Sequence, residues 1–177
     1  MTNQYSLHPF EPENFSGDLN LQGNLNYEEN LLHIEYVISD DWQKVKIPSK
    51  SNSCDRQDGL WETTCLEFFI GIVDSPIYWE FNLSPSGCWN VYRFTGYREG
   101  MEIETAFENL PFEFIQQSDR LLLQIQIDTT QIVKKSQALE IAITTVIEEQ
   151  EGNISYWALK HSGKQADFHL RDSFVPL

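Results

Sequence analysis

Apolar and polar residues alternate with a period of two along most of the chain, a pattern typical of half-buried β-strands. Leu19, Leu21 and Leu25 begin one such run, and a second run covers residues 32–38 after a polar break at 28–30. Two alternating runs around a polar break predict a β-hairpin. Further short strands are predicted at 42–48, 66–73, 78–84, 88–95, 112–117, 120–128, 138–148 and 154–160.

The remaining segments contain turn residues or have no clear period. Residues 1–18 carry two prolines and a glycine and are expected to form a strand or tail along the domain edge. Residues 49–58 form a polar loop, 129–136 are the only candidate for a short helix, and 167–177 add a last strand. The chain is therefore predicted to be all-β, with a single domain over residues 1–177. Its about ten short strands would form an antiparallel β-sandwich of the jelly-roll type.

The alternation also indicates which side chains share a face, because a shift of one residue exchanges the two faces of a strand. If Val73 pairs near Tyr78 around a loop that contains Pro76, the apolar side chains of residues 66–72 and 79–83 lie on one face. The opposite face then has a polar and aromatic character. It carries Glu67, Phe69, Gly71, Tyr78, Glu80, Asn82 and Ser84.

The turn at residues 84–87 allows two registers for the next strand. A two-residue loop places Trp89 and Arg93 on the polar face, with Arg93 opposite Glu80. A five-residue loop places Trp89 in the core and Arg93 opposite Trp79. Burying an unpaired guanidinium is strongly unfavourable, so we predict the two-residue loop.

Twelve basic and twenty-seven acidic residues give the chain a net charge of −15. Such an acidic surface repels phosphate groups, so neither nucleic acid nor an anionic membrane is an expected partner. No stretch has the about 20 apolar residues of a membrane-spanning helix. The first residues lack the basic and apolar regions of a secretion signal.

The three cysteines, Cys54, Cys65 and Cys88, form no CxxC pair. An odd number of cysteines without a secretion signal favours reduced thiols and a cytoplasmic location. Cys65 is expected to be a buried packing residue.

Four segments carry a resemblance to a known family. They are DGLWETTCLEFFI (58–70), YWEFNLSPSGCWNVYRF (78–94), YREGM (97–101) and SYWALKHSGKQADFHLRDSF (155–174). Together they resemble the DOMON-like proteins, which are related to family 9 carbohydrate-binding modules. In sugar-binding members of that wider family, two tryptophans sandwich a sugar ring while carboxylate, amide and arginine groups bond its hydroxyls. A structural calcium ion is also typical there, but no dense Asp/Asn loop here supports one.

The resemblance implies a binding module without catalysis of its own, for a carbohydrate or a similar small polar ring. Trp61 and Glu67 match the start of the family motif, and Arg93 matches its later arginine. Trp157 corresponds to the second tryptophan, although its neighbours Tyr156 and Leu159 leave its facing open. The full set of expected ligand-binding residues is Trp61, Glu67, Glu80, Asn82, Arg93, Trp157, His161 and His169, with Glu80 orienting Arg93.

Other functions stay open. Haem binding requires axial ligands, for which Met101 and His161 are candidates, and neither haem nor calcium has a clear motif. No metal site is predicted, because the order of His161, Asp167 and His169 fits no usual motif and a hydrogen-bonded cluster explains them better. The aromatic face could also bind a protein partner.

Catalysis is the less favoured possibility. Glu67 and Glu80 lie on one predicted face, as the two carboxyl groups of a glycosidase would. However, pairing of Glu80 with Arg93 would lower the pKa of Glu80 and prevent it from acting as a general acid. Neither the ligand nor the oligomeric state follows from the sequence.

Overall fold

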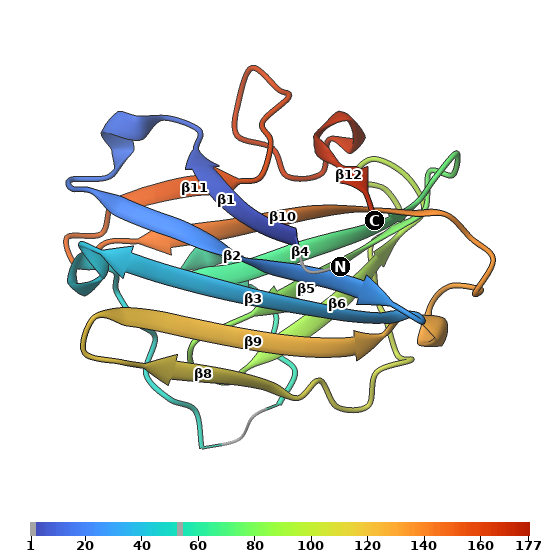
Figure 1. The fold of residues 1–177 in the computed structure, drawn as a ribbon, viewed down its shortest axis with the longest axis horizontal. Helices are drawn as coiled ribbons and strands as arrows, with labels where there is room; N and C mark the ends of the chain where they lie inside the picture. The colour runs from blue at the N-terminus through green and yellow to red at the C-terminus, as the bar shows by residue number, and fades with distance from the viewer. Residues whose placement is uncertain (1–2, 53–54) are drawn as a thin grey trace.

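The protein is described by a computed structural model over residues 3–52 and 55–177, and its strands form an antiparallel β-sandwich (Figure 1). The first sheet contains β1 (Asn3–Pro9), β2 (Leu19–Glu28), β3 (Leu31–Asp40), β9 (Arg120–Asp128) and β8 (Phe112–Gln116) in that order. The second sheet contains β7 (Glu102–Ile103), β6 (Trp89–Phe94), β5 (Tyr78–Leu83), β4 (Cys65–Ile72), β10 (Leu139–Glu148) and β11 (Ile154–Ala158), and β12 (Val175–Pro176) pairs with β10. The predicted all-β sandwich is confirmed, with twelve strands in the described residues.

The helical elements of the described residues are short 3-10 turns, and none is a long apolar helix able to cross a membrane. They are η1 (Pro12–Asn14), η2 (Trp42–Lys44), η3 (Leu60–Glu62), η4 (Thr129–Gln131) and η5 (Arg171–Ser173). Two predictions are wrong here: residues 42–48 begin with η2 in place of a strand, and the helix expected at 129–136 is only the single turn η4. Cys54 lies outside the described residues, and Cys65 is fully buried with a free thiol.

The first strand, β1, joins the two sheets. Its residues Asn3–Leu7 pair with β2, while His8 and Pro9 pair with Ala158 and Trp157 of β11. The N-terminal segment is therefore a central strand between β2 and β11, and the expectation that it lies along an edge is wrong.

Apolar side chains from the facing surfaces of the two sheets form the core. The first sheet alternates along each strand, so that in β3 Leu32, Ile34, Tyr36 and Ile38 point inward. The second sheet contributes the inward residues of β4, β5 and β6, where the rings of Phe68 and Phe81 stack at 4.3 Å between centroids. This core holds the two sheets together and leaves one face of each sheet pointing away from it.

We call the face of the second sheet that points away from the core its outer face. The β4–β5 hairpin pairs Gly71 with Tyr78, two residues away from the predicted partner Val73. A shift of two residues leaves every side chain on the same face of its strand, so the predicted polar and aromatic set does lie on the outer face. Its glycine, Gly71, leaves room for the Arg171 guanidinium, whose Nη2 atom would lie 2.6 Å from an added Cβ.

The register predicted for β6 is wrong. Leu83 pairs with Trp89 and Trp79 pairs with Arg93, so the loop between β5 and β6 contains the five residues 84–88. Trp89 consequently lies in the core, and Arg93 lies on the inner face. Arg93 is half-buried at the end of β6 beside the short edge strand β7, so its charge reaches solvent and the burial cost we assumed does not arise.

Candidate ligand-binding cleft

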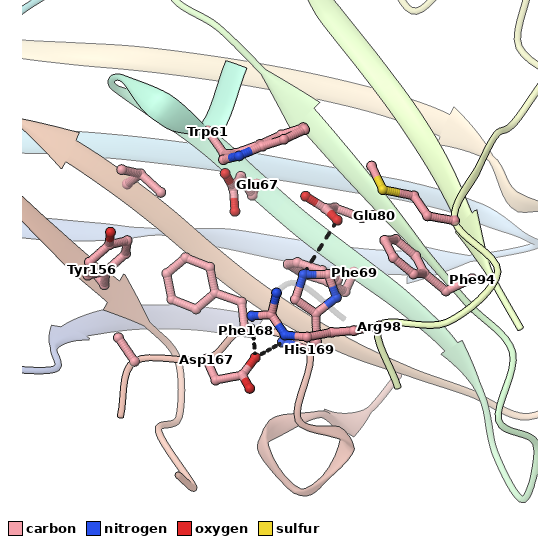
Figure 2. A pocket seen from close by; sticks show the side chains of 13 residues that line it. Trp61, Glu67, Phe69, Glu80, Phe94, Arg98, Tyr156, Asp167, Phe168 and His169 are labelled. Carbon is pink, nitrogen blue, oxygen red and sulfur yellow. Dashed lines mark hydrogen bonds and ion pairs between the residues drawn. The ribbon is translucent and has the colours of Figure 1, made fainter. Parts of the chain in front are cut away.

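A cleft of about 330 Å³ lies over the outer face of the second sheet (Figure 2). The sheet forms its floor with side chains from β4, β5, β6, β10 and β11. Three other segments form its walls: η3, the turn after β6, and the C-terminal segment between β11 and η5. The lining residues are Trp61, Glu67, Phe69, Glu80, Phe94, Arg98, Met101, Val146, Tyr156, Ala166, Asp167, Phe168 and His169.

Two carboxyl groups, those of Glu67 and Glu80, lie on the floor. Phe69 pairs directly with Glu80 and Asn82 with Glu67, so the two acids are diagonal neighbours on β4 and β5. Both residues are buried, with 2% of Glu67 and 5% of Glu80 exposed. Burial, together with the nearby charge of Glu80, raises the pKa of Glu67 well above its ordinary range. Burial also raises the pKa of Glu80 to about 7, although Asn82 and Arg98 act against this rise.

The hydrogen-bonding capacity of these acids is only partly used. Asn82 donates to Oε1 of Glu80 at 3.0 Å, and the Thr144 hydroxyl lies 3.5 Å from Oε2 of Glu67. Oε1 of Glu67 is buried and has no hydrogen-bond partner among the described residues. Leaving a buried polar atom unpaired costs about 1–3 kcal/mol, so this oxygen is a place where a donor from a ligand would be stabilising.

His169 lies beside Glu80 and is held by a tyrosine. Its Nε2 atom is 3.7 Å from Oε2 of Glu80, and its Nδ1 atom is 2.8 Å from the Tyr78 hydroxyl. The backbone N–H of Arg98 donates to that same hydroxyl oxygen, so the hydroxyl is free to donate its proton to Nδ1. This arrangement places the imidazole proton on Nε2, facing Glu80. Burial and the charge of Arg98 lower the pKa of His169 to about 4.

Arg98 and Asp167 form an ion pair at the mouth of the cleft. The guanidinium donates to Oδ1 of Asp167 at 2.9 Å, and the His169 backbone N–H also donates to this oxygen. Partial burial acts to raise the pKa of Asp167, but hydrogen bonds from Tyr97, Arg98 and the His169 amide outweigh it and leave this pKa below its ordinary value. Asp167 thus neutralises Arg98 and ties the C-terminal segment to the turn after β6.

Trp61 forms the upper wall of the cleft, and the glycine-initiated turn η3 positions its side chain. Gly59 adopts a left-handed conformation with φ of 73°, which starts η3, and the buried Leu60 anchors this turn. Trp61 then projects outward, 38% exposed, and its ring meets Tyr92 edge-on at 5.7 Å between centroids. The segment before η3 is held to β6, since the Asp58 carboxylate accepts hydrogen bonds from Tyr92 and Asn90.

The cleft contains part of the predicted ligand-binding set. Trp61, Glu67, Glu80 and His169 line it, and Asn82 adjoins it through its bond to Glu80. Arg93 lies on the inner face, away from Glu80, so it cannot be oriented by Glu80 as predicted.

Two more predicted residues lie elsewhere. Trp157 is 5% exposed within the core, packed edge-on against Phe15, because Ser155 and Trp157 are the inward residues of β11. Its neighbour Tyr156 is the one that points to the cleft. His161 lies 2.8 Å from the backbone oxygen of His8 and is not brought together with Met101.

Sequence reasoning missed the arginine of the cleft, Arg98, and three of its rings, Phe94, Tyr156 and Phe168. The correct β5–β6 register would have pointed to Phe94, since Asn90, Tyr92 and Phe94 repeat the polar and aromatic character of β5. No period in residues 159–174 indicates that this segment folds over the sheet. Among the described residues no three His, Cys, Asp or Glu side chains are grouped as a metal site would require.

Comparisons with known proteins show that this fold is shared with a solved structure. No protein-family model matches the sequence, and no curated protein matches it significantly. The structure is similar to that of a "putative carbohydrate-binding protein" from Bacteroides uniformis ATCC 8492, with a TM-score of 0.66 and 11% identity over 96% of this chain and 84% of that chain. A family 9 carbohydrate-binding module from Caldicellulosiruptor kristjanssonii, in complex with glucose, gives a TM-score of 0.48 and 10% identity over 82% of this chain and 69% of that chain. The first likeness shows a shared fold, and the predicted DOMON-like membership stays a prediction.

Proposed function

We propose that the cleft binds a carbohydrate or a similar small polar ring and catalyses no reaction on it. The observation that carries this proposal is the unpaired, buried Oε1 atom of Glu67 in a cleft walled by aromatic rings. A sugar presents apolar C–H faces to aromatic rings and hydroxyl donors to carboxyl oxygens. The description of the Bacteroides uniformis structure that shares the fold agrees with this choice.

The cleft offers the two kinds of contact in separate places. Trp61 stands at the rim with its ring partly exposed, so it can stack on one face of a sugar. Glu67, Glu80 and His169 lie below it and can bond the hydroxyl edge, while Arg98 supplies a further donor at the mouth. A volume of about 330 Å³ is at the lower end of small-molecule sites, which suits one sugar ring.

A thermal-shift panel of mono- and disaccharides tests the proposal. A sugar held at about 100 times its dissociation constant should stabilise the protein by about 2.7 kcal/mol, or about 5–10 °C for a chain of this size. Trp61→Ala should remove the shift and Trp61→Phe should keep part of it. Trp157→Phe is the matched control and should bind as the unsubstituted protein does. A panel without any shift, or a shift unaffected by Trp61→Ala, would refute sugar binding in this cleft.

Glycoside hydrolysis is a second candidate, because Glu80 is not paired with Arg93 and keeps its proton near neutral pH. A hydrolase also needs a second carboxylate that is ionised, but the pKa of Glu67 is raised as well. Binding without hydrolysis is therefore the better supported function. The protein incubated with aryl glycosides should release no more phenol than its Glu80→Gln variant does.

The cytoplasmic location that the sequence favours stays a prediction.

A further inference from the structure

The cleft as a whole is lined by more acidic than basic groups. Glu67, Glu80 and Asp167 face a single cation, Arg98, and that cation is already paired with Asp167. His169 adds no positive charge near neutral pH, because its pKa is lowered to about 4. The two floor carboxyls are therefore left without a cation of their own among the described side chains that line the cleft.

We infer that the ligand carries a positively charged amino group, so that the cleft is specific for an amino sugar over a neutral sugar. This inference rests on the proposed function, since it places an ammonium group on the polar ring that the cleft binds. The ammonium would lie between Glu67 and Glu80 and donate to the unpaired Oε1 atom of Glu67. Burial raises the pKa of both carboxyl groups, and proximity to Glu80 raises that of Glu67 further, so their charged forms are disfavoured without a ligand. A hydroxyl can donate to this oxygen as well, but only a cation offsets the cost of ionising these groups side by side.

The aromatic walls favour the same group. The rings of Trp61, Phe69, Phe94, Phe168 and Tyr156 surround the two carboxyls in the cleft (Figure 2). Faces of aromatic rings attract cations, and this attraction is largest where the cation is withdrawn from water. In a site of acidic groups enclosed by rings, an ammonium group is stabilised both by the carboxyl oxygens and by the ring faces. A neutral hydroxyl gains only the hydrogen bond.

A metal ion fits the site less well than an ammonium group. Hard cations take six or more oxygen ligands, and transition metals take at least three protein side chains. The described side chains hold no group of three potential metal ligands, and eight of the thirteen residues that line the cleft are apolar or aromatic. An organic ammonium needs only a few acceptors and an apolar surround.

Calorimetric titration with three sugars of one ring shape tests the inference. The probes are glucosamine, glucose and N-acetylglucosamine, which carry an ammonium, a hydroxyl and a neutral amide at the same carbon. Glucosamine should bind at least tenfold more tightly than the other two at pH 7. Glu67→Gln should reduce this preference to less than threefold while glucose binding persists. The matched control is Glu113→Gln, on an exposed position of β8, which should retain the preference.

The outcomes separate the inference from the proposed function. Equal affinities for glucose and glucosamine would overturn the amino-sugar inference and leave sugar binding in place. A preference for glucosamine that persists in Glu67→Gln would also overturn it, because the ammonium would then be recognised elsewhere. If no sugar binds, both proposals fail together.

Discussion

The two sheets of the sandwich differ in how they use the face that points away from the core. In the first sheet, buried and accessible residues alternate, as β3 shows along nearly its whole length. In the second sheet, β4 and β5 are buried at all but one of their positions, although one face carries Glu67, Glu80 and Asn82.

A sandwich needs only one buried face per sheet to form its core, so the first sheet represents what the fold itself requires. Burying two carboxyl groups on the second sheet is costly and contributes nothing to packing between the sheets. The outer face of the second sheet, with its three covering segments, is therefore adapted to a task beyond folding. We take that task to be ligand binding.

The largest effect should follow a change on the inner face of the second sheet. Phe68→Ala removes a fully buried ring that stacks on Phe81, and it should lower the free energy of unfolding by about 3–5 kcal/mol. Urea unfolding monitored by circular dichroism measures this. Glu113→Ala on the exposed face of β8 is the control and should change stability by less than about 0.5 kcal/mol. A loss below about 1 kcal/mol for Phe68→Ala would mean that the two sheets do not share this core.

The buried titrating groups of the outer face should give the protein two opposing pH dependences. The folded state holds the Glu80 proton up to about pH 7, while the unfolded chain releases it near pH 4.5. Stability from this group is therefore full below about pH 4.5 and is lost as the pH rises to about 7. The folded state binds a proton on His169 only near pH 4, whereas the unfolded chain binds one near pH 6.5. Stability from His169 is consequently lost as the pH falls from about 6.5 to about 4.

Each substitution should remove one of these two pH dependences of stability and leave the other in place. Relative to the unsubstituted protein, Glu80→Gln should gain about 3 kcal/mol between pH 4.5 and pH 7, and His169→Gln should lose about as much between pH 4 and pH 6.5. Chemical unfolding at a series of pH values measures both. Parallel pH profiles for the two variants would contradict the burial of these groups in the folded state.

The stability of the C-terminal segment that covers the outer face should depend on Arg171. Its guanidinium donates to the backbone oxygens of Ile72, Ser75 and Ile77 and pairs with Glu140. Arg171→Met keeps most of the apolar stem but removes the cation that pairs with Glu140 and the side-chain donor of the Ser75 oxygen, which should cost about 2 kcal/mol. The Ile72 and Ile77 oxygens each keep a backbone N–H donor. Amide hydrogen exchange at residues 167–174 should become faster. Arg120→Met, on an exposed ion pair, should change neither quantity.

The smallest predicted effect separates two arginines that lie on different faces. Arg98→Gln should weaken sugar binding by roughly fivefold, since it removes one charged donor at the mouth of the cleft. Arg93→Gln should leave binding unchanged, because Arg93 is on the inner face. Calorimetric titration with glucose, a neutral sugar that Arg98 does not repel, measures both. Equal losses in the two variants would show that the effect of charge is general and not local to the cleft.

Much of the fold followed from alternation, because a period of two is a local property of each strand. The strands predicted at 66–73, 78–84 and 120–128 agree with β4, β5 and β9 to within one residue at each end. The faces of β4 and β5 were correct even though their hairpin is shifted by two residues, since such a shift does not exchange faces. The site depended on properties that are not local.

The two wrong predictions about the site, the register of β6 and the role of Trp157, have physical causes. The register of β6 depended on the cost of burying Arg93, and that cost was unknowable without its position beside the edge strand β7. Trp157 follows Tyr156 in sequence, and both are large aromatic residues, so hydrophobicity alone could not decide which one faces the core. The closing of the cleft by Asp167 and His169 relies on an irregular segment whose path no pattern predicts.

One measurement tests most directly that the outer face of the second sheet binds the ligand. The five tryptophans give five indole N–H resonances in a ¹⁵N-labelled sample, and Trp61→Phe identifies that of Trp61. Trp42, Trp79, Trp89 and Trp157 are buried in the core, whereas Trp61 lines the cleft. Adding a sugar that stabilises the protein should shift the Trp61 resonance and leave that of Trp157 in place. A shift of Trp157 without a shift of Trp61 would contradict the account.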